Sequence, residues 1–223
     1  MELTHGIISL DSALKSHIYI IPVKDGYVLI DTGWCCTISE SIKEIKSLKI
    51  DFNKIKMILL THCDLDHIGG CFEISKLTNC PIYASKKEIK KCYNKKRSVN
   101  SKKLSYEIFG NENGIDSYPE YDTNKLIPLP KNRIGDFTIV NAPGHSYKMK
   151  CFIYKDVLFA GDLIMTRKGV IESNPECSNM NNKSYYKTLK NFDMSKINLI
   201  CQSHGKPIEA HPAWETFIKT LKI

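Results

Sequence analysis

Short runs of β-branched and aromatic residues alternate along the chain with polar turns and with segments of helical periodicity. Residues 17–23 (HIYIIPV) and 27–33 (YVLIDTG) are two such runs. The residues between them, Lys24-Asp25-Gly26, have the composition of a tight turn. The pattern therefore predicts two strands joined as a β-hairpin.

The chain then continues with alternating helix and strand patterns. Four apolar residues recur at helical spacing and are expected on one helix face: Ile38, Ile42, Ile45 and Leu48. The elements predicted here are a helix over 36–49, a buried strand over 56–61 (KMILLT), a helix over about 67–77, a strand over 81–84 (PIYA) and a helix from Ser85 onward. This order is typical of βαβ units.

Apolar runs resume near the middle of the chain after a polar segment. The predicted strands are KLIPL (125–129), DFTIV (136–140), CFIY (151–154), VLFA (157–160) and INLIC (197–201), with helices near 181–192 and 210–222. The whole pattern predicts an α/β protein with two sheets and helices outside them. The polar segment at about 85–124 is expected to be an irregular insertion and the place where specificity resides.

Length and composition suit a single globular domain over 1–223. The chain has 223 residues, of which 42% are hydrophobic, enough for a buried core. The first residues lack the charged and apolar regions of a signal peptide, and no apolar run is long enough for a membrane span. We therefore expect a cytoplasmic protein without a membrane partner.

The net charge of +8 comes from one segment. Residues 86–103 (KKEIKKCYNKKRSVNSKK) contain nine lysines and arginines and one glutamate. Such a block can attract phosphate-bearing partners, or it can be a solvated helix and loop. Because the block has a single aromatic, Tyr93, and no series of interleaved aromatics to stack on bases, the solvated interpretation is favoured over nucleic-acid binding.

Nine cysteines are scattered without a C-x-x-C pair: Cys35, Cys36, Cys63, Cys71, Cys80, Cys92, Cys151, Cys177 and Cys201. An odd number without regular spacing argues against a disulfide framework. We expect most of them to be reduced packing or surface residues.

The most unusual stretch is THCDLDHIGG, residues 61–70. His62 and Asp64 follow the predicted strand 56–61, and their i, i+2 spacing can turn both side chains the same way. Asp66 and His67 lie at the start of the next helix, where a carboxylate is favoured, and the two glycines permit backbone to approach closely. Imidazole and carboxylate groups crowded in this way predict a divalent metal site.

Three more polar residues each follow a predicted strand and adjoin a glycine. They are His145 in APGHS, Asp162 in LFAGDL and His204 in ICQSHG. Strand ends are where α/β proteins gather functional side chains, and three such placements are improbable by chance. We expect these residues to add to the metal ligands.

The ordered set LIDTG, H-x-D-x-D-H-x-G-G, GHS, GD and SHG, from Asp31 to His204, resembles the signature of the metallo-β-lactamase-fold superfamily, in its glyoxalase II-like or lactonase-like branch. The resemblance implies an αβ/βα four-layer sandwich with two mixed sheets, helices on both outer faces and a dinuclear site. His62, Asp64 and His145 would hold one ion, and Asp66, His67 and His204 the other. Asp162 would bridge the ions, while Asp31 would order the loops without being a ligand.

Asp64 departs from the family pattern, in which most hydrolases have histidine at this place. The flavodiiron branch has a glutamate there, so an acidic residue is compatible with a metal site. With Asp64, the two divalent ions and three carboxylates would carry a net charge of about +1, which lowers the acidity of bound water and favours harder ions such as iron or manganese. Alternatively, Asp64 points to solvent and leaves the first site weakened.

Other residues near the motifs are given simpler roles. Alternation turns Cys63 away from the ligands, which favours packing over ligation. The histidines without motif context, His5, His17 and His211, are expected to be ordinary polar or edge residues, although His17 and His211 could line a cleft. Arg167 and Lys168 follow the GDL motif and are candidates for binding an anionic substrate group.

The predicted function is metal-dependent hydrolysis of a small-molecule ester, thioester, lactone or phosphoester. Two divalent ions, zinc above all and iron or manganese otherwise, would provide the attacking hydroxide and polarise the substrate. Asp66 would be both a ligand and a candidate proton acceptor. No serine or cysteine triad is required.

Two other functions stay open at this point. Asp64 favours a flavodiiron-like oxidoreductase, which would need a separate electron donor. The basic block favours a nucleic-acid-processing hydrolase, for which steep salt dependence of binding is the expected sign. The motifs do not determine the substrate or the oligomeric state.

Overall fold

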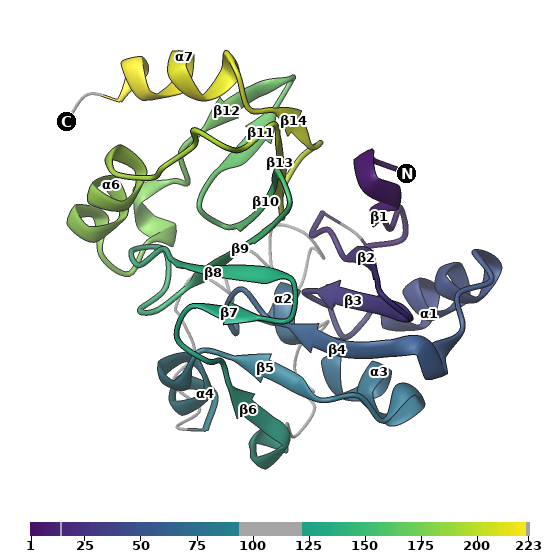
Figure 1. The fold of residues 1–223 in the computed structure, drawn as a ribbon. Helices are drawn as coiled ribbons and strands as arrows, with labels where there is room; N and C mark the ends of the chain where they lie inside the picture. The colour runs from purple at the N-terminus through teal and green to yellow at the C-terminus, as the bar shows by residue number, and fades with distance from the viewer. Residues whose placement is uncertain (14, 94–121, 222–223) are drawn as a thin grey trace. The chain divides into compact units, whose positions relative to one another are not determined.

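The computed structural model describes residues 1–13, 15–93 and 122–221. It divides into two compact units, Met1–Pro128 and Leu129–Ile223. Each unit contains one six-stranded mixed sheet together with helices, drawn in purple to teal for the first unit and in green to yellow for the second (Figure 1). The predicted α/β class with two mixed sheets is confirmed. A single domain over 1–223 stays a prediction, and most of the insertion predicted at 85–124 lies outside the described residues.

The first sheet has the strand order β1-β2-β3-β4-β5-β6. Its strands are β1 (Ile8–Ser9), β2 (Tyr19–Val23), β3 (Gly26–Ile30), β4 (Ile55–Leu59), β5 (Ile82–Ala84) and β6 (Leu126–Pro128). The first three strands are antiparallel, and the last four are parallel. The predicted hairpin is confirmed, because Val23 pairs with Gly26 across a two-residue turn in which Asp25 has a φ of 62°.

The helices of the first unit connect the parallel strands. They are α1 (Ile38–Ser47), α2 (Leu65–Ile68), α3 (Cys71–Thr78) and α4 (Lys86–Tyr93), with 3₁₀ turns at Thr4–Gly6, Phe52–Lys54 and Thr123–Lys125. Apolar residues of α1, α3 and the strands form one core cluster. On β3, Leu29 belongs to this cluster while Val28 and Ile30 are buried on the opposite face, which explains why the parallel strands are continuous apolar runs.

Two details of the predicted helices are wrong. Leu48, expected within the first helix, is the C-cap residue of α1, which ends at Ser47, and it is 42% exposed. The helix expected over 67–77 is divided into α2 and α3 at Gly69-Gly70. A Cβ atom at Gly70 would lie 2.2 Å from Ile38 Cδ1, so the glycines serve the packing of this junction against α1.

The second sheet has the strand order β14-β13-β10-β9-β8-β7. Its strands are β7 (Arg133–Ile134), β8 (Phe137–Asn141), β9 (Lys150–Tyr154), β10 (Val157–Gly161), β13 (Leu199–Gln202) and β14 (Ile208–Glu209). Only the β10 and β13 pair is parallel among these neighbours. The connection between β10 and β13 contains a short hairpin, a 3₁₀ turn and a helix.

That connection carries several residues of the candidate site. It consists of β11 (Met165–Arg167), β12 (Val170–Glu172), a 3₁₀ turn (Glu176–Ser178) and α6 (Asn182–Lys190), and α7 (Ala213–Thr220) closes the chain. Apolar residues of the sheet, α6 and α7 form the core cluster of this unit. Within the described ranges, none of the helices combines the length and apolar character needed to cross a bilayer.

Candidate functional site

The residues of the opening motif lie where β4 gives way to α2. The strand ends at Leu59, and His62 and Asp64 follow it, with Asp64 in extended backbone just before α2. Asp66 and His67 lie inside this four-residue helix. The carbonyl of Asp64 accepts the N–H groups of His67 and Ile68, at 2.9 and 3.0 Å, and so begins the helix. Apart from Asp64, these predicted ligands are almost completely buried.

Asp31 lies at the centre of a hydrogen-bond network beneath these residues. It follows β3 with a φ of 55° and is 1% exposed. Its Oδ1 accepts the N–H of Thr61 at 2.8 Å, while its Oδ2 accepts the hydroxyl of Thr61 at 2.7 Å and lies 2.9 Å from His67 Nδ1. A carboxylate at Nδ1 fixes the orientation of an imidazole ring and directs Nε2 the other way.

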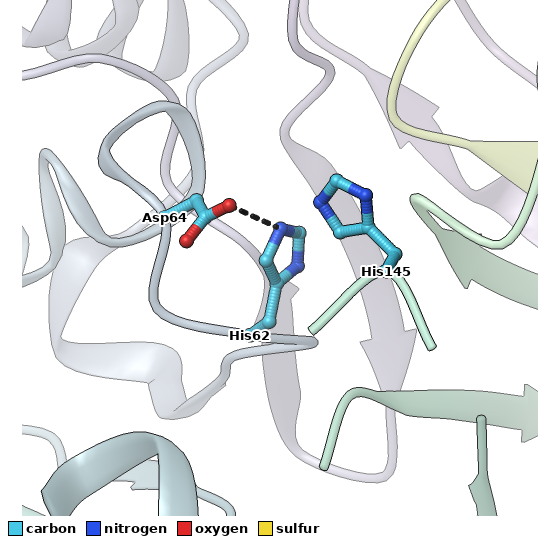
Figure 2. A group of neighbouring side chains, drawn as sticks. All are labelled: His62, Asp64 and His145. Carbon is cyan, nitrogen blue, oxygen red and sulfur yellow. Dashed lines mark ion pairs between the residues drawn. The ribbon is translucent and has the colours of Figure 1, made fainter. Parts of the chain in front are cut away.

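His62 is oriented in a similar way by its neighbour. Thr61 Oγ1 lies 3.0 Å from His62 Nδ1. His62 Nε2 is 3.7 Å from Asp64 Oδ2, and the Asp64 side chain is 16% exposed, so the carboxylate faces the His62 ring more than the solvent. Figure 2 shows this pair, joined by a dashed line, and also draws His145 of the second unit. His67 Nε2 is 3.4 Å from Asp66 Oδ2.

Backbone carbonyls of the short helix are held by two buried hydroxyls. Ser16 Oγ donates to the carbonyl of Asp66 at 2.6 Å. Thr32 donates to the carbonyl of His67 through both its N–H, at 2.8 Å, and its hydroxyl, at 2.7 Å. Gly69 and Gly70 follow the short helix. A Cβ at Gly69 would lie 2.4 Å from Cys35 N, so only glycine allows this close packing. This contact packs Gly69 against the loop after β3, and the close approach of the glycine backbone to the site stays a prediction.

In the second unit, Asp162 lies between two histidines. His145 follows β8, Asp162 directly follows β10, and His204 follows β13. Asp162 Oδ2 is 3.3 Å from His145 Nε2 and also 3.3 Å from His204 Nε2. The Asp162 side chain is 9% exposed, and that of His204 is 20% exposed, so the group retains some access to solvent.

Sequence reasoning missed the residues that hold this second set in place. Asn174 Nδ2 donates to the carbonyl of Asp162 and lies 3.5 Å from His145 Nδ1. The N–H of Thr166 donates to the carbonyl of His204 at 3.0 Å. Gln202 Nε2 in turn donates to the hydroxyl of Thr166 at 2.6 Å. No spacing in the sequence links Asn174 or Thr166 to the motif residues. Gln202 had a signal, since it lies two residues before His204 in ICQSHG, and so did Thr61 in the first unit, which is next to His62.

The distances between donor atoms fit shared metal ligation better than direct hydrogen bonding. Two ligand atoms each about 2.1 Å from a tetrahedral ion are about 3.4 Å apart, whereas a direct N–H···O bond has a length of about 2.9 Å. Each of the four histidine Nε2 atoms is 3.3 to 3.7 Å from an aspartate oxygen. The donor set, imidazole and carboxylate, also suits a divalent ion. All seven predicted ligands are among the residues that could hold a metal ion.

The residues given simpler roles have ordinary surroundings. Cys63 is buried in the core cluster of the first unit, as its alternation predicts. His17 Nδ1 is 2.9 Å from Ser9 Oγ, and exposed His211 is 3.7 Å from Glu215. His5 is exposed. Eight cysteines, all except Cys92, form no disulfide, and burial raises the pKa of the Cys201 thiol, which disfavours thiolate chemistry there.

Arg167 and Lys168 lie on the β11–β12 hairpin next to Thr166. Arg167 Nε is 3.7 Å from Glu172 Oε2, and its side chain is 69% exposed. Lys168 has a φ of 51° at the turn of the hairpin. The hydrogen bond from Thr166 to His204 places this hairpin near one predicted ligand, but a role of the two basic residues in substrate binding stays a prediction.

The sequence is similar to a family model and to proteins described as metal-dependent hydrolases. A family model described as the metallo-beta-lactamase superfamily matches residues 12–204. The chain is 26% identical over 205 residues to the probable metallo-hydrolase YybB of Bacillus subtilis, an alignment that covers 89% of this chain and 86% of that protein. It is 24% identical over 172 residues to the probable polyketide biosynthesis zinc-dependent hydrolase PksB of the same organism, covering 74% of this chain and 64% of PksB.

A solved structure has the same fold. The crystal structure of the archaeal protein ST1585 from Sulfolobus tokodaii, described as a metallo-beta-lactamase superfamily protein, aligns with a TM-score of 0.74. The alignment covers 99% of this chain and 89% of that chain, at 20% sequence identity. At this identity the likeness establishes the fold and leaves the substrate undetermined.

Proposed function

Because this chain belongs to the metallo-beta-lactamase superfamily, we propose that it hydrolyses a small-molecule substrate with two divalent metal ions held by its seven motif residues. His62, Asp64 and His145 would hold one ion, and Asp66, His67 and His204 the other. Asp162 would bind both. The prediction of a metallo-hydrolase of this superfamily is confirmed at the level of the family. The number of ions, their identity and the substrate belong to the proposal.

The geometry within each unit supports the proposal. The Nδ1 atoms of His62 and His67 are engaged by Thr61 and Asp31, so that Nε2 of each ring is directed to the carboxylate side. In the second unit, one oxygen of Asp162 is equally distant from two Nε2 atoms. A carboxylate in this position is suited to bridge two ions, and this observation carries the proposal.

Bound ions would supply an acidified water as nucleophile and a Lewis acid for the substrate oxygen. The residues of the chain have separate tasks. Asp31 and Thr61 hold the imidazole rings in one tautomer and orientation. Asp66, whose carboxylate is buried next to His67, would accept a proton from the water or pass one to the leaving group. Burial of Asp31, Thr61 and Asp66 strengthens the electrostatic interactions of these groups.

The substrate class proposed is an ester, thioester, lactone or phosphoester. Each of these has an electrophilic carbon or phosphorus and an oxygen that a metal ion can polarise. Zinc is the ion proposed first, because the relative PksB is described as a zinc-dependent hydrolase, and Asp64 favours iron or manganese as the alternative. Arg167 and Lys168 would bind an anionic part of the substrate.

Metal analysis of protein purified without added metal tests the proposal. We expect about two equivalents of a divalent ion per chain, and loss of hydrolysis on treatment with a chelator, restored by adding zinc back. Hydrolysis is to be screened with ester, thioester, lactone and phosphodiester substrates. Activity that survives complete metal removal contradicts the proposal. Near-stoichiometric iron with rapid oxygen consumption replaces it with the di-iron oxidoreductase.

Replacing Asp64 with histidine is expected to retain or increase zinc occupancy and hydrolysis. Histidine supplies a neutral nitrogen ligand at the same place and raises the net charge of the loaded site by one, so the pKa of bound water should fall further. Zinc content, the rate and its pH profile are measured together, and the acidic limb of the profile should move to lower pH. A collapse of zinc binding in Asp64→His would show that the electrostatic reasoning about Asp64 is wrong.

A further inference from the structure

One buried tyrosine joins two of the segments that carry candidate ligands in the second unit. The ring of Tyr185, on α6, is 1% exposed. Its hydroxyl donates to the carbonyl of Leu163 at 2.9 Å and accepts the N–H of Asn174 at 2.8 Å. Leu163 is the residue after Asp162, so the hydroxyl fixes the turn that carries the proposed bridging carboxylate.

Asn174 continues this chain of hydrogen bonds to the ligands themselves. It is 3% exposed, its amide nitrogen donates to the carbonyl of Asp162, and the same atom is 3.5 Å from Nδ1 of His145. The side chain of Asn174 therefore lies between the backbone of one candidate ligand and the ring of another. Because its own N–H is held by Tyr185, the position of the amide depends on α6.

The start of α6 also holds the loop of His145. The carbonyl of His145 accepts the N–H of Met180 at 3.0 Å, and the carbonyl of Gly144 accepts the N–H of Asn181 at 3.0 Å. Further along the helix, Thr188 Oγ1 donates to the carbonyl of Pro143 at 2.7 Å. These bonds leave the loop little freedom to move relative to the helix.

We propose that Tyr185 and Asn174 are positioning residues that set the relative orientation of His145 and Asp162 for metal binding. This inference rests on the proposed function, in which both residues are ligands. Neither Tyr185 nor Asn174 would touch an ion or the substrate. Partners of this kind, one step removed from the ligands, typically change metal affinity about 10–100-fold when removed.

The first test is Tyr185→Phe, with Tyr186→Phe as the matched control. Phenylalanine keeps the buried ring and removes only the hydroxyl that joins Leu163 to Asn174. Tyr186 is the next residue of the same helix, but its hydroxyl contacts Glu176 at 3.2 Å at an exposed position. In competition with a chelator, Tyr185→Phe is expected to bind Zn²⁺ about tenfold more weakly than the wild type, and Tyr186→Phe equally well.

The second test is Asn174→Ala, with Asn191→Ala as control, because Asn191 is exposed and its side-chain amide donates to the nearby carbonyl of Lys187 in α6. Asn174→Ala is also expected to weaken Zn²⁺ binding about tenfold. Tyr185 and Asn174 act through one chain of hydrogen bonds. The Zn²⁺ affinity of the double variant should therefore be little lower than that of the single variant that binds Zn²⁺ less tightly. Losses that multiply in the double variant would overturn the shared chain of bonds.

A spectroscopic measurement separates positioning from a general loss of stability. Each variant is loaded with Co²⁺, whose visible absorption reports the coordination geometry, at a temperature where circular dichroism shows the metal-free protein folded. We expect an altered band shape for Tyr185→Phe and Asn174→Ala and the wild-type spectrum for both controls. Wild-type affinity and spectrum in folded Tyr185→Phe and Asn174→Ala would refute the positioning role. Failure of the wild type itself to bind Zn²⁺ or Co²⁺ would instead refute the proposed function.

Discussion

Replacing Asp162 with alanine is expected to abolish hydrolysis and the binding of metal. The carboxylate has one oxygen 3.3 Å from the Nε2 atoms of both His145 and His204, the position from which it would bind both ions. Loss of a bridging ligand removes metal-based stabilisation of the transition state, which amounts to several kcal/mol, so the rate should fall at least about 1,000-fold. Initial rates at saturating zinc and the metal content after gel filtration measure the two effects.

The metal-free Asp162→Ala variant should nevertheless fold. Without an ion, the 9% exposed carboxylate is a polar group whose burial opposes folding, so its removal should cost little stability. In the wild type, zinc at 100 times its Kd should add about 2.7 kcal/mol, or a rise in Tm of roughly 5–10 °C. The variant should show no such rise.

Asp136→Ala is the matched control for Asp162→Ala. Asp136 is exposed at the turn between β7 and β8, and its replacement makes the same change in net charge. The control should keep the hydrolytic rate, the metal content and the stabilisation by zinc. If Asp162→Ala also keeps its metal and its rate, Asp162 is not a ligand and the proposed bridging role is wrong.

The positions of the candidate ligands could be predicted because each belongs to a local pattern. A strand that ends before a short polar motif can be recognised within about ten residues of sequence, and the order of five such motifs carries the family resemblance. The side chains of His62 and Asp64 lie near each other, as their i, i+2 spacing predicts, with His62 Nε2 3.7 Å from Asp64 Oδ2. The role of Thr61 could also be predicted from its position next to His62, and it contacts both Asp31 and His62.

The supporting residues could not be predicted, because they act over long sequence separations. Ser16 reaches the carbonyl of Asp66 across 50 residues, and Asn174 reaches the carbonyl of Asp162 from the far side of a hairpin. A backbone carbonyl can accept a hydrogen bond from almost any donor, so it imposes no residue pattern on its partner. Only the three-dimensional packing determines which donor is present.

Errors in the predicted elements have local physical causes. The hairpin of β11 and β12 was missed because its strands have three residues each, too few to show alternation, although Lys168 and Gly169 with positive φ form the kind of turn that joins such strands. A single helix was predicted over 67–77, although two adjacent glycines can end one helix and begin another. The close packing of Gly70 against Ile38 accompanies the break between α2 and α3, which the apolar periodicity alone does not predict.

Replacing Gly144 with alanine is expected to cause a large loss of stability. Gly144 has a φ of 142°, and an added Cβ would lie 2.2 Å from Cα and 2.4 Å from N of Tyr185. These are backbone atoms of α6, so relief requires movement of the helix or of the His145 loop. Backbone strain and overpacking together should cost about 3–5 kcal/mol, a fall in Tm of roughly 10 °C, as measured by thermal and urea unfolding of the metal-free protein.

Gly169→Ala separates the two causes of that loss. Gly169 also has a positive φ, 79°, but an added Cβ would meet no atom within 4 Å. It should therefore lose only about 1 kcal/mol, from backbone strain alone, and should bind zinc normally. Because the contact with α6 also sets the place of His145, any folded Gly144→Ala protein should bind zinc more weakly than Gly169→Ala. Equal stability and equal zinc affinity of the two variants would show that the His145 loop can move away from α6 at no cost, and that its close packing on the helix does not position the ligand.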